Sequence, residues 1–416
     1  MKAAALAGLL ALAGPALAAT REIYVWQRQA ARAEVGAAIR EFAPRVEGFC
    51  VLAAEVSWRG GRMTTVRPRL DYAALIAARR PVGLALRVGA FAGPFAGDDA
   101  TARALAALAR ALLTEARGAG LEPAELQIDF DCAESKLAGY RLWLGALRAA
   151  AGGARLGFTA LPVWLRHAEF TALARAADSF VLQVHALEKP TGPETPFTLC
   201  DPERALAWAR QAGAAGVPFR VALPTYGYAL HFDATGRFVA LAAEGPGVAA
   251  PPGGRLRVVR SDAPELARLA RRLADDPPPQ CTGVIWFRLP VAGDRLNWSA
   301  ETMRVVLGGG IPERKLIGEV QRPEPGLAEI FLVNAGQTTE PLPARIDLSA
   351  GDARPLAVDN LGGFQLVMAQ GRVQGIERAA GASEEASLAP GARMLIAWLR
   401  HAHEVPVTVS LPPPRP

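Results

Sequence analysis

The sequence predicts a (β/α)8 TIM barrel followed by a small β-sandwich module, and three observations support this. Short β-rich runs alternate eight times with amphipathic Ala/Leu/Arg runs between residues 21 and 310. Strand–helix alternation at this spacing implies right-handed crossovers and a parallel sheet, and eight units fit a closed barrel. After Gly308-Gly309-Gly310 the pattern changes to short strands separated by turn residues. A doubly wound open sheet is the alternative for the first part, but its glycine-rich first turn is absent.

The eight expected barrel strands are short and rich in β-branched and aromatic residues. They are Arg21–Trp26, Phe49–Trp58, Val82–Gly89, Leu126–Asp131, Leu156–Trp164, Phe180–Leu187, Phe219–Tyr226 and Thr282–Leu289. The clearest helical segments between them are Ala102–Arg117, Leu137–Ala151, Glu203–Ala214 and Ala263–Ala274.

One connection is unusually long for a barrel. After Tyr226 the chain contains three β-like pieces, Tyr228–Phe232, Arg237–Ala242 and Arg255–Val259, with a Gly/Pro-rich loop at Gly245–Gly254. We therefore expect a small β insertion after strand seven, on the carboxyl-terminal rim of the barrel.

The last part of the chain reads as an accessory domain over residues 320–411. Its expected strands are Ile330–Asn334, Ala344–Leu348, Phe364–Met368, Met394–Trp398 and Val405–Leu411, with a frayed tail at Pro412–Pro416.

The first residues predict export. Lys2 precedes an apolar run, and Ala16-Leu17-Ala18 offers the small residues that a signal peptidase cleaves, so residues 1–18 read as a signal peptide. We expect a soluble periplasmic or secreted protein with no transmembrane segment after cleavage. The net charge of +6 is spread over 416 residues with scattered arginines, which does not favour a nucleic-acid partner. The oligomeric state is left open.

The four cysteines match no metal-binding spacing, while an oxidising compartment permits disulfides. Cys132 and Cys200 both follow barrel strands on the same rim, so this pair is the single bridge that we expect. Cys50 and Cys281 lie at the starts of strands that strand one separates, beyond disulfide reach.

The best candidate active site lies on strand four. Alternate residues of a barrel strand face the helices and the interior. Leu126, Ile128 and Phe130 must face the helices, which leaves Gln127, Asp129 and Asp131 pointing inward. Two carboxylates at the carboxyl end of a barrel strand are costly to bury without a purpose, and barrel enzymes carry their chemistry at that end.

The same alternation applied to the other strands gives a mouth that contains acids, a histidine, arginines and aromatics. Such a mouth suits a sugar, because ring faces stack on aromatics while hydroxyls form hydrogen bonds. Besides the strand-four residues, its expected members are Tyr24, Trp26, Glu55, Arg87, Gln183, His185, Tyr226, Trp286 and Arg288.

Each member also has a purely structural interpretation. Asp131 could cap the helix that starts near Ser135, Asp129 could pair with Arg87, and Glu55 could do the same. His185, Trp26 and Trp286 could be core residues. Asp129, Asp131, His185 and Glu55 could instead be metal ligands, but no HxH or HExxH pairing accompanies them. We therefore expect no metal ion and no cofactor.

Several segments carry a resemblance to known families: YVWQRQ, LQIDFDCAESKLAGY, FTALPVWL, ALPTYGY and VIWFRLP. Together they look like an uncharacterised bacterial family, domain of unknown function 3142, whose barrel is similar to chitinase-type glycoside hydrolases of family 18. The likeness covers roughly residues 21–310. Chitinase-like barrels carry D-x-D-x-E on strand four, and Gln127, Asp129 and Asp131 occupy those alternate positions.

The resemblance implies roles for these residues. Asp131 stands where that family has its proton donor, and Asp129 where an aspartate assists the substrate acetamido group. Tyr226 and Trp286 resemble sugar-contacting aromatics. The sequence departs from the pattern because Gln127 replaces an acid and Asp131 is one methylene shorter than Glu. Gln183-Val184-His185 also replaces the strand-six Met-x-Tyr-Asp pattern.

The sequence thus favours an exported glycoside hydrolase-like protein that acts on or binds a polysaccharide or glycan, with Asp131 as the candidate general acid. The alternative is a non-catalytic carbohydrate-binding or cell-envelope scaffold protein, and a third reading is a metal-dependent hydrolase.

Overall fold

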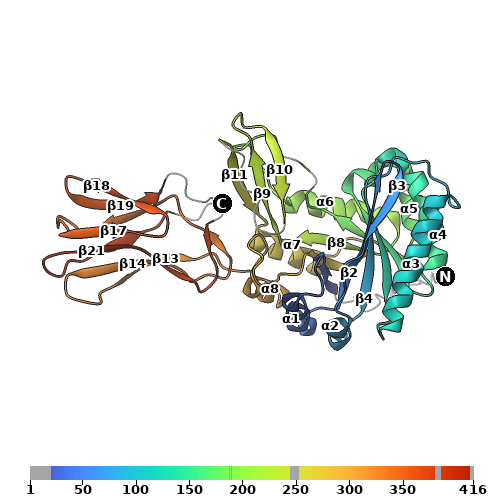
Figure 1. Ribbon diagram of the computed structural model, residues 1–416, viewed down its shortest axis with the longest axis horizontal. Helices are drawn as coiled ribbons and strands as arrows, with labels where there is room; N and C mark the ends of the chain where they lie inside the picture. Colours follow the sequence, from blue (N-terminus) through green and yellow to red (C-terminus); the bar gives the residue numbers. More distant parts are fainter. Residues whose placement is uncertain (1–19, 187, 189, 244–252, 380–385, 413–416) are drawn as a thin grey trace, which may run out of the picture.

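The computed structural model describes residues 20–186, 188, 190–243, 253–379 and 386–412. The chain forms a barrel from which a second, all-β module extends to one side (Figure 1). No helix in these ranges is long and apolar enough to cross a membrane. The expected signal peptide and the Pro412–Pro416 tail, apart from Pro412, lie outside the described residues.

The first part is a closed parallel barrel, as the sequence predicts. Strand β1 pairs in parallel with both β2 and β12, which closes the ring in the order β1-β12-β8-β7-β6-β5-β4-β2. All eight strands expected from the sequence are present. Their bounds are β1 Thr20–Val25, β2 Gly48–Arg59, β4 Val82–Val88, β5 Glu125–Phe130, β6 Arg155–Ala160, β7 Ser179–Gln183, β8 Phe219–Pro224 and β12 Cys281–Phe287.

Helices cover the outside of the barrel. The outer face of β5 shows how: Leu126, Ile128 and Phe130 are fully buried, and Phe130 stacks on Trp143 at 5.5 Å between ring centroids. The helices are α1 Ala33–Phe42, α2 Tyr72–Ala77, α3 Ala100–Gly118, α4 Leu137–Ala150, α5 Ala168–Arg175, α6 Pro202–Ala212, α7 Ala263–Asp275 and α8 Ala300–Leu307. Short 3₁₀ turns are η1 Ala43–Arg45, η2 Glu134–Lys136, η3 Pro162–Arg166 and η4 Gly213–Ala215.

The bottom of the barrel interior holds a buried charge cluster. Arg220 on β8 donates to both oxygens of Glu125, at 2.7 and 2.6 Å, and pairs with Glu22. The inward position of β6 at this level is Gly157, where a Cβ atom would lie 1.9 Å from Glu125 Oε1. A larger residue on β6 would therefore displace the carboxylate that neutralises Arg220.

Strand β2 contains a bulge and continues past the rim. The register with β4 shifts between Leu52 and Ala54. Before the shift, Cys50 and Leu52 point inward and belong to the apolar cluster inside the barrel, which is called the inner cluster below. After the shift, Glu55 points inward to the mouth while Val56 packs outward. The end of β2 pairs with β3 (Arg62–Val66) in an antiparallel hairpin that the sequence did not predict.

The insertion after the seventh barrel strand is confirmed as a three-stranded antiparallel sheet in the order β10-β9-β11. Its strands are β9 Gly227–Phe232, β10 Phe238–Ala242 and β11 Arg255–Arg260. Most of the expected Gly245–Gly254 loop lies outside the described residues. Arg257 Nη1 donates to the carbonyls of Pro193 and Thr195, at 3.0 and 2.6 Å, and thereby ties the loop after β7 to this sheet.

The second module contains two four-stranded antiparallel sheets, β13-β14-β21-β17 and β18-β19-β16-β22, around an apolar core that includes Ile330, Leu332, Ile346 and Ile376. This confirms the expected β-sandwich. Its first strand begins at Leu316, slightly before the boundary expected at residue 320. The strands are β13 Leu316–Gln321, β14 Leu327–Asn334, β15 Glu340–Pro341, β16 Arg345–Ser349, β17 Ala357–Asn360, β18 Phe364–Ala369, β19 Arg372–Arg378, β20 Ser387–Leu388, β21 Arg393–Arg400 and β22 Thr408–Ser410.

The expected Cys132–Cys200 bridge is wrong for this structure, because all four cysteines are free. Cys132 is buried against the outer core, where its carbonyl accepts a hydrogen bond from Trp164 Nε1 at 3.2 Å. This contact fixes the rim loop after β5 without a disulfide.

Candidate functional site

Strand β5 places its two acids as the sequence predicts, at the carboxyl end of the barrel. Leu126, Ile128 and Phe130 pack outward, so Asp129 faces the interior near the rim. Asp131 follows directly after the last residue of the strand. The two carboxylates therefore lie at the end of the barrel where enzymes of this fold bind substrates.

Asp131 is exposed and forms no hydrogen bond or ion pair with the part of the chain that the structure describes. It is not a helix cap: Ala133 precedes η2 and Lys136 precedes α4, and neither helix start receives a side-chain cap. Desolvation by the walls of the mouth, followed by repulsion from Asp129, raises the pKa of Asp131 from 3.8 to about 6, although Arg87 opposes the shift. A carboxyl group with this pKa is able to carry a proton at mildly acidic pH.

Asp129 is held from two sides. Thr159 Oγ1 on β6 donates to Asp129 Oδ1 at 2.7 Å, and Arg87 Nε on β4 lies 3.8 Å from Oδ2. Burial raises the pKa of Asp129, while the Thr159 hydrogen bond and Arg87 act against that rise. The ion pair with Arg87, considered above as a structural alternative, is therefore present alongside the exposed Asp131.

Glu55 is the third acid of the mouth and is the most fully neutralised. Arg28 Nε donates to Oε2 at 2.8 Å, and Arg87 Nη1 lies 3.2 Å from Oε1. Arg87 thus bridges Glu55 and Asp129 and joins three strands at the rim. These contacts leave Asp131 as the one carboxylate of the three without a cationic partner among the described residues.

The opposite wall consists of hydroxyl and aromatic groups. His185 Nδ1 lies 3.3 Å from the Tyr226 hydroxyl, which lies 3.2 Å from the Tyr228 hydroxyl. His185 stacks on Phe287 at 5.4 Å between ring centroids. Burial lowers the pKa of His185 to about 3, so the imidazole is neutral and serves as a hydrogen-bonding group. Tyr228 is the half-buried outer member of this chain.

Three further predicted residues lie below or beside these groups. Gln127 is fully buried one layer beneath Asp129 and accepts a hydrogen bond from the Tyr24 hydroxyl at 2.5 Å. Trp26 is buried against Tyr24 and Phe287. Gln183 is half-buried, and its Nε2 lies 3.4 Å from the His185 carbonyl.

The expected inward direction of Trp286 on the eighth barrel strand is wrong. Ile285 and Phe287 belong to the inner cluster, whereas Trp286 faces the helices and contacts Trp298 at 5.4 Å. Trp286 lines a separate cavity of about 270 Å³ between β1, β12, α7 and α8. The run Val-Ile-Trp-Phe contains no polar residue, so its alternation does not reveal which set faces inward.

Arg288 follows directly after β12, and both of its Nη groups are bound by the protein. It pairs with Asp294 and donates to the Ala243 carbonyl at 2.9 Å, with its guanidinium 5.9 Å from the centre of the Tyr226 ring. It therefore supports the wall of the mouth.

Sequence reasoning missed four residues of this site: Arg28, Thr159, Tyr228 and Phe287. Thr159 follows from alternation on β6, because Phe158 and Ala160 must pack outward. Phe287 would have been found if the inward-facing phase of β12 had been assigned correctly. Arg28 lies in the loop after β1, where no periodic pattern indicates the direction of a side chain. Tyr228 belongs to the insertion, whose folding back over the mouth is a tertiary feature.

Within the described ranges, no group of three or more His, Cys, Asp or Glu side chains is arranged to hold a metal ion. The acids of the mouth are arranged around arginines instead.

The fold and this rim define a TIM-barrel protein with a pair of carboxylates at the carboxyl end of β5. The family model of a domain of unknown function, DUF3142, matches residues 80–292, which is more than half of the chain. The chain therefore belongs to this family, and the resemblance seen in the sequence is confirmed.

No curated protein matches the chain. Among solved structures, a chitinase from Chromobacterium violaceum is similar over 71% of this chain and 100% of its own, with 16% identity and a TM-score of 0.48. The spore cortex-lytic enzyme SleL from Bacillus cereus matches 70% of this chain and 74% of its own, with 12% identity and a TM-score of 0.47. Chitinase ChiA74 from Bacillus thuringiensis matches 94% of this chain and 100% of its own, with 9% identity and a TM-score of 0.46.

The raised pKa of Asp131 predicts a pH-dependent stability. The folded protein binds the proton of Asp131 more tightly than the unfolded chain, whose Asp titrates near 3.8. Stability should therefore fall as pH rises from about 4 to about 6, and this contribution should vanish in Asp131→Asn. We expect a ¹³C carboxyl titration to place Asp131 near 6, with melting curves of the two proteins diverging over that window. A midpoint near 4 for Asp131 would contradict the expectation.

Proposed function

We propose that the barrel is a glycoside hydrolase-like enzyme that acts on a polysaccharide or glycan, with Asp131 as its general acid. The observation that carries this proposal is the state of Asp131. It is exposed at the carboxyl rim, has no partner among the described residues, and has a pKa of about 6 because of desolvation and Asp129.

The proposed chemistry assigns separate roles to the two acids. Protonated Asp131 transfers its proton to the glycosidic oxygen as the bond from the anomeric carbon to that oxygen breaks, and water supplies the hydroxyl of the new reducing end. Asp129, fixed by Thr159 and Arg87, orients the substrate or the water. Tyr226 and Tyr228 supply hydroxyl groups, and Phe287 an apolar surface, on the facing wall.

The test of this proposal is the release of reducing ends from a panel of soluble glycans. The D-x-D-x-E-like run makes oligosaccharides of β-1,4-linked N-acetylglucosamine the first probe. We expect turnover that declines above pH 6, where Asp131 loses its proton. Absence of turnover across the panel at pH 4–7, together with measurable binding by calorimetry, would reject the hydrolase.

A second candidate function is binding of a glycan without hydrolysis. It is favoured by the internal neutralisation of the mouth, because Arg28 and Arg87 already compensate Glu55 and Asp129. In that case a glycan would bind with unchanged chain length, and replacing Asp131 would alter affinity only.

We also propose that the protein is exported to the periplasm or beyond. The Lys2 start, the apolar run and Ala16-Leu17-Ala18 support this. Sequencing the amino terminus of the protein recovered from cells should give Ala19, and a retained Met1 would contradict export by this route.

A further inference from the structure

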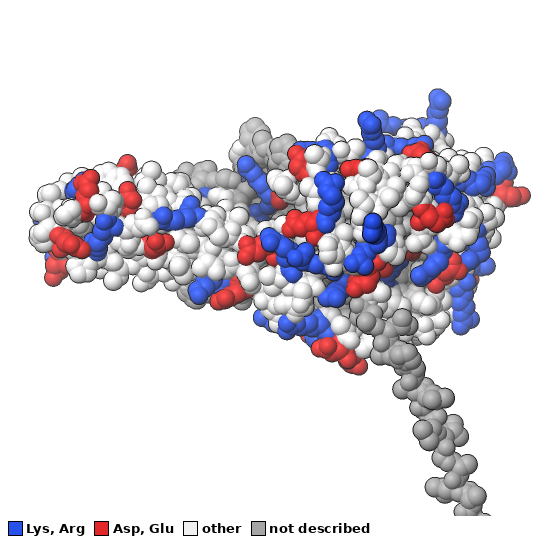
Figure 2. Space-filling view, turned by 90° about the horizontal axis from the view of Figure 1, so that it is seen from below, with Lys and Arg blue, Asp and Glu red and all other residues white. Residues whose placement is uncertain are grey.

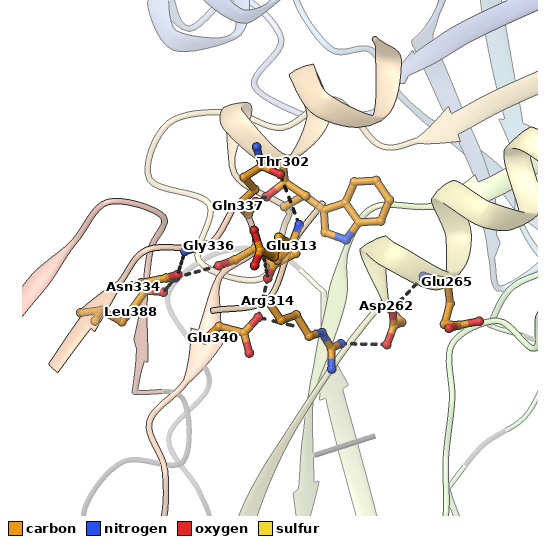
Figure 3. Close-up of polar contacts among 12 residues, drawn as sticks. Asp262, Glu265, Thr302, Glu313, Arg314, Asn334, Gly336, Gln337, Glu340 and Leu388 are labelled. Atoms are coloured by element: carbon orange, nitrogen blue, oxygen red, sulfur yellow. Dashed lines mark hydrogen bonds and ion pairs between the residues drawn. The ribbon is translucent and has the colours of Figure 1, made fainter. Parts of the chain in front are cut away.

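The second module contacts the barrel at one turn, residues 260–262, which connects strand β11 to helix α7 (Figure 3). This turn is called the corner below. Arg314, in the connection that leads into β13, donates from Nη2 to Asp262 Oδ2 at 2.8 Å. The other oxygen of Asp262 accepts from the Glu265 backbone N–H at 2.9 Å and caps α7. One carboxylate thus joins the helix start to the second module.

Two further contacts link the second module to this corner. Arg314 Nε lies 4.0 Å from Glu340 Oε1 on β15, and Glu340 is itself buried and hydrogen-bonded by Thr338. On the other side of the corner, Arg260 Nη2 lies 3.4 Å from Ser387 Oγ on β20. Strands β15 and β20 pair with each other, so both contacts come from one small sheet of the module.

The connection between the modules is short, and hydrogen bonds hold it to both of them. Thr302 Oγ1 on α8 donates to the Gln337 carbonyl at 2.6 Å, and the Gln337 backbone N–H donates to the Glu313 carbonyl at 2.7 Å. At Gly336 a Cβ atom would lie 2.5 Å from the Lys315 nitrogen. These contacts tie the connection both to α8 and to the second module.

This corner is connected directly to the wall of the mouth that carries Tyr226 and Tyr228. The Ser261 backbone N–H donates to the Tyr226 carbonyl at 3.1 Å. In the β9–β11 ladder, Arg260 pairs with Gly227 and Val259 pairs with Tyr228. The approach is close, because a Cβ atom on Gly227 would lie 2.6 Å from the Val259 carbonyl. Trp298 Nε1 also donates to the Ser261 carbonyl at 3.2 Å and so holds the corner from the barrel side.

We propose that the β-sandwich braces the substrate-facing wall of the barrel, with Arg314 as the positioning residue that transmits the constraint through Asp262 to Tyr226 and Tyr228. The module fixes the corner from outside while Trp298 fixes it from inside. The hydroxyl groups of the wall are then held at one distance from β5. This role does not depend on whether the mouth hydrolyses a glycan or only binds it.

The test is hydrogen–deuterium exchange of the full chain, read in peptides covering residues 226–232 and 255–262. Arg314→Ala should make both peptides exchange roughly two- to five-fold faster, as expected for the loss of a partly exposed ion pair. Arg314→Lys should restore the slow exchange, since an ammonium group is able to pair with Asp262. The matched control is Arg345→Ala, which removes the exposed Arg345–Asp347 pair of the sandwich (2.7 Å) and should leave both peptides unchanged.

Three outcomes would overturn the proposal. Faster exchange confined to residues 311–316 would mean that Arg314 stabilises only the joint. Equal acceleration in β5 and β6 would indicate general destabilisation of the barrel. No change in either wall peptide would show that the module does not constrain the wall.

Discussion

Replacing Asp131 by Asn should lower the kcat of glycan hydrolysis by about 10²–10⁴-fold, the range that a general acid contributes. The amide has nearly the same shape as the carboxyl group but has no proton to transfer at mildly acidic pH. Because Asp131 is exposed and has no partner among the described residues, the substitution removes no contact that holds the fold. The residual activity should lose the decline above pH 6 that we expect for the wild-type protein.

The control for this substitution is Glu134→Gln. Glu134 is an exposed acid three residues further along the same rim, at the start of η2, and undergoes the same chemical change. It should keep kcat within about two-fold, since surface substitutions of this kind have small effects. Equal losses in the two variants, or full activity in Asp131→Asn, would remove Asp131 from the reaction.

The largest expected effect on stability belongs to the bottom of the barrel. Arg220→Leu should lower the free energy of unfolding by about 3–5 kcal/mol, because it leaves the buried Glu125 and the partly buried Glu22 without their cation. Burial already raises the pKa of Glu22 in spite of Arg220, so the loss should shrink at acidic pH as Glu22 takes up a proton. Urea unfolding at pH 7 and pH 4.5 measures both effects.

Two comparisons make this result specific. Arg345→Leu removes an exposed ion pair and should cost about 0–1 kcal/mol. Adding Glu22→Gln and Glu125→Gln to Arg220→Leu should recover part of the lost stability, because no uncompensated charge then remains. If Arg220→Leu unfolds at the same urea concentration as Arg345→Leu, the cluster does not stabilise the barrel.

The strands and their order could be predicted because a parallel barrel buries both faces of each strand and repeats its pattern. The inward side of β5 was predictable for a narrower reason: polar residues alternate with Leu126, Ile128 and Phe130, so only one phase is possible. On β12 the residues Val284, Ile285, Trp286 and Phe287 are all apolar, and both phases satisfy burial. The wrong phase brought Trp286 into the expected site and left Phe287 out.

The remaining differences arise where tertiary contacts decide. Glu55 was expected in the mouth and lies there, but it does so through a register shift that leaves no mark in the sequence. Tyr228 was missed because it reaches the mouth only where the insertion folds back on the rim. The charges of the surface show the same limit in another way. Lysines and arginines are interspersed with acids over the barrel face in Figure 2, as scattered sequence positions suggest, but the pairs that form are properties of the fold.

The bulge between Leu52 and Ala54 divides β2 into two segments, and the side chains that face the barrel interior alternate in a different phase in each. The lower segment keeps the phase that packing requires, while the upper segment is free to adopt the opposite phase and present Glu55 to the rim. In a strand of this kind the residues at the rim can change without a change in the packing of the barrel beneath them. Insertion or loss of one alanine at this point would exchange the residues offered to a ligand and leave the packed layers in place.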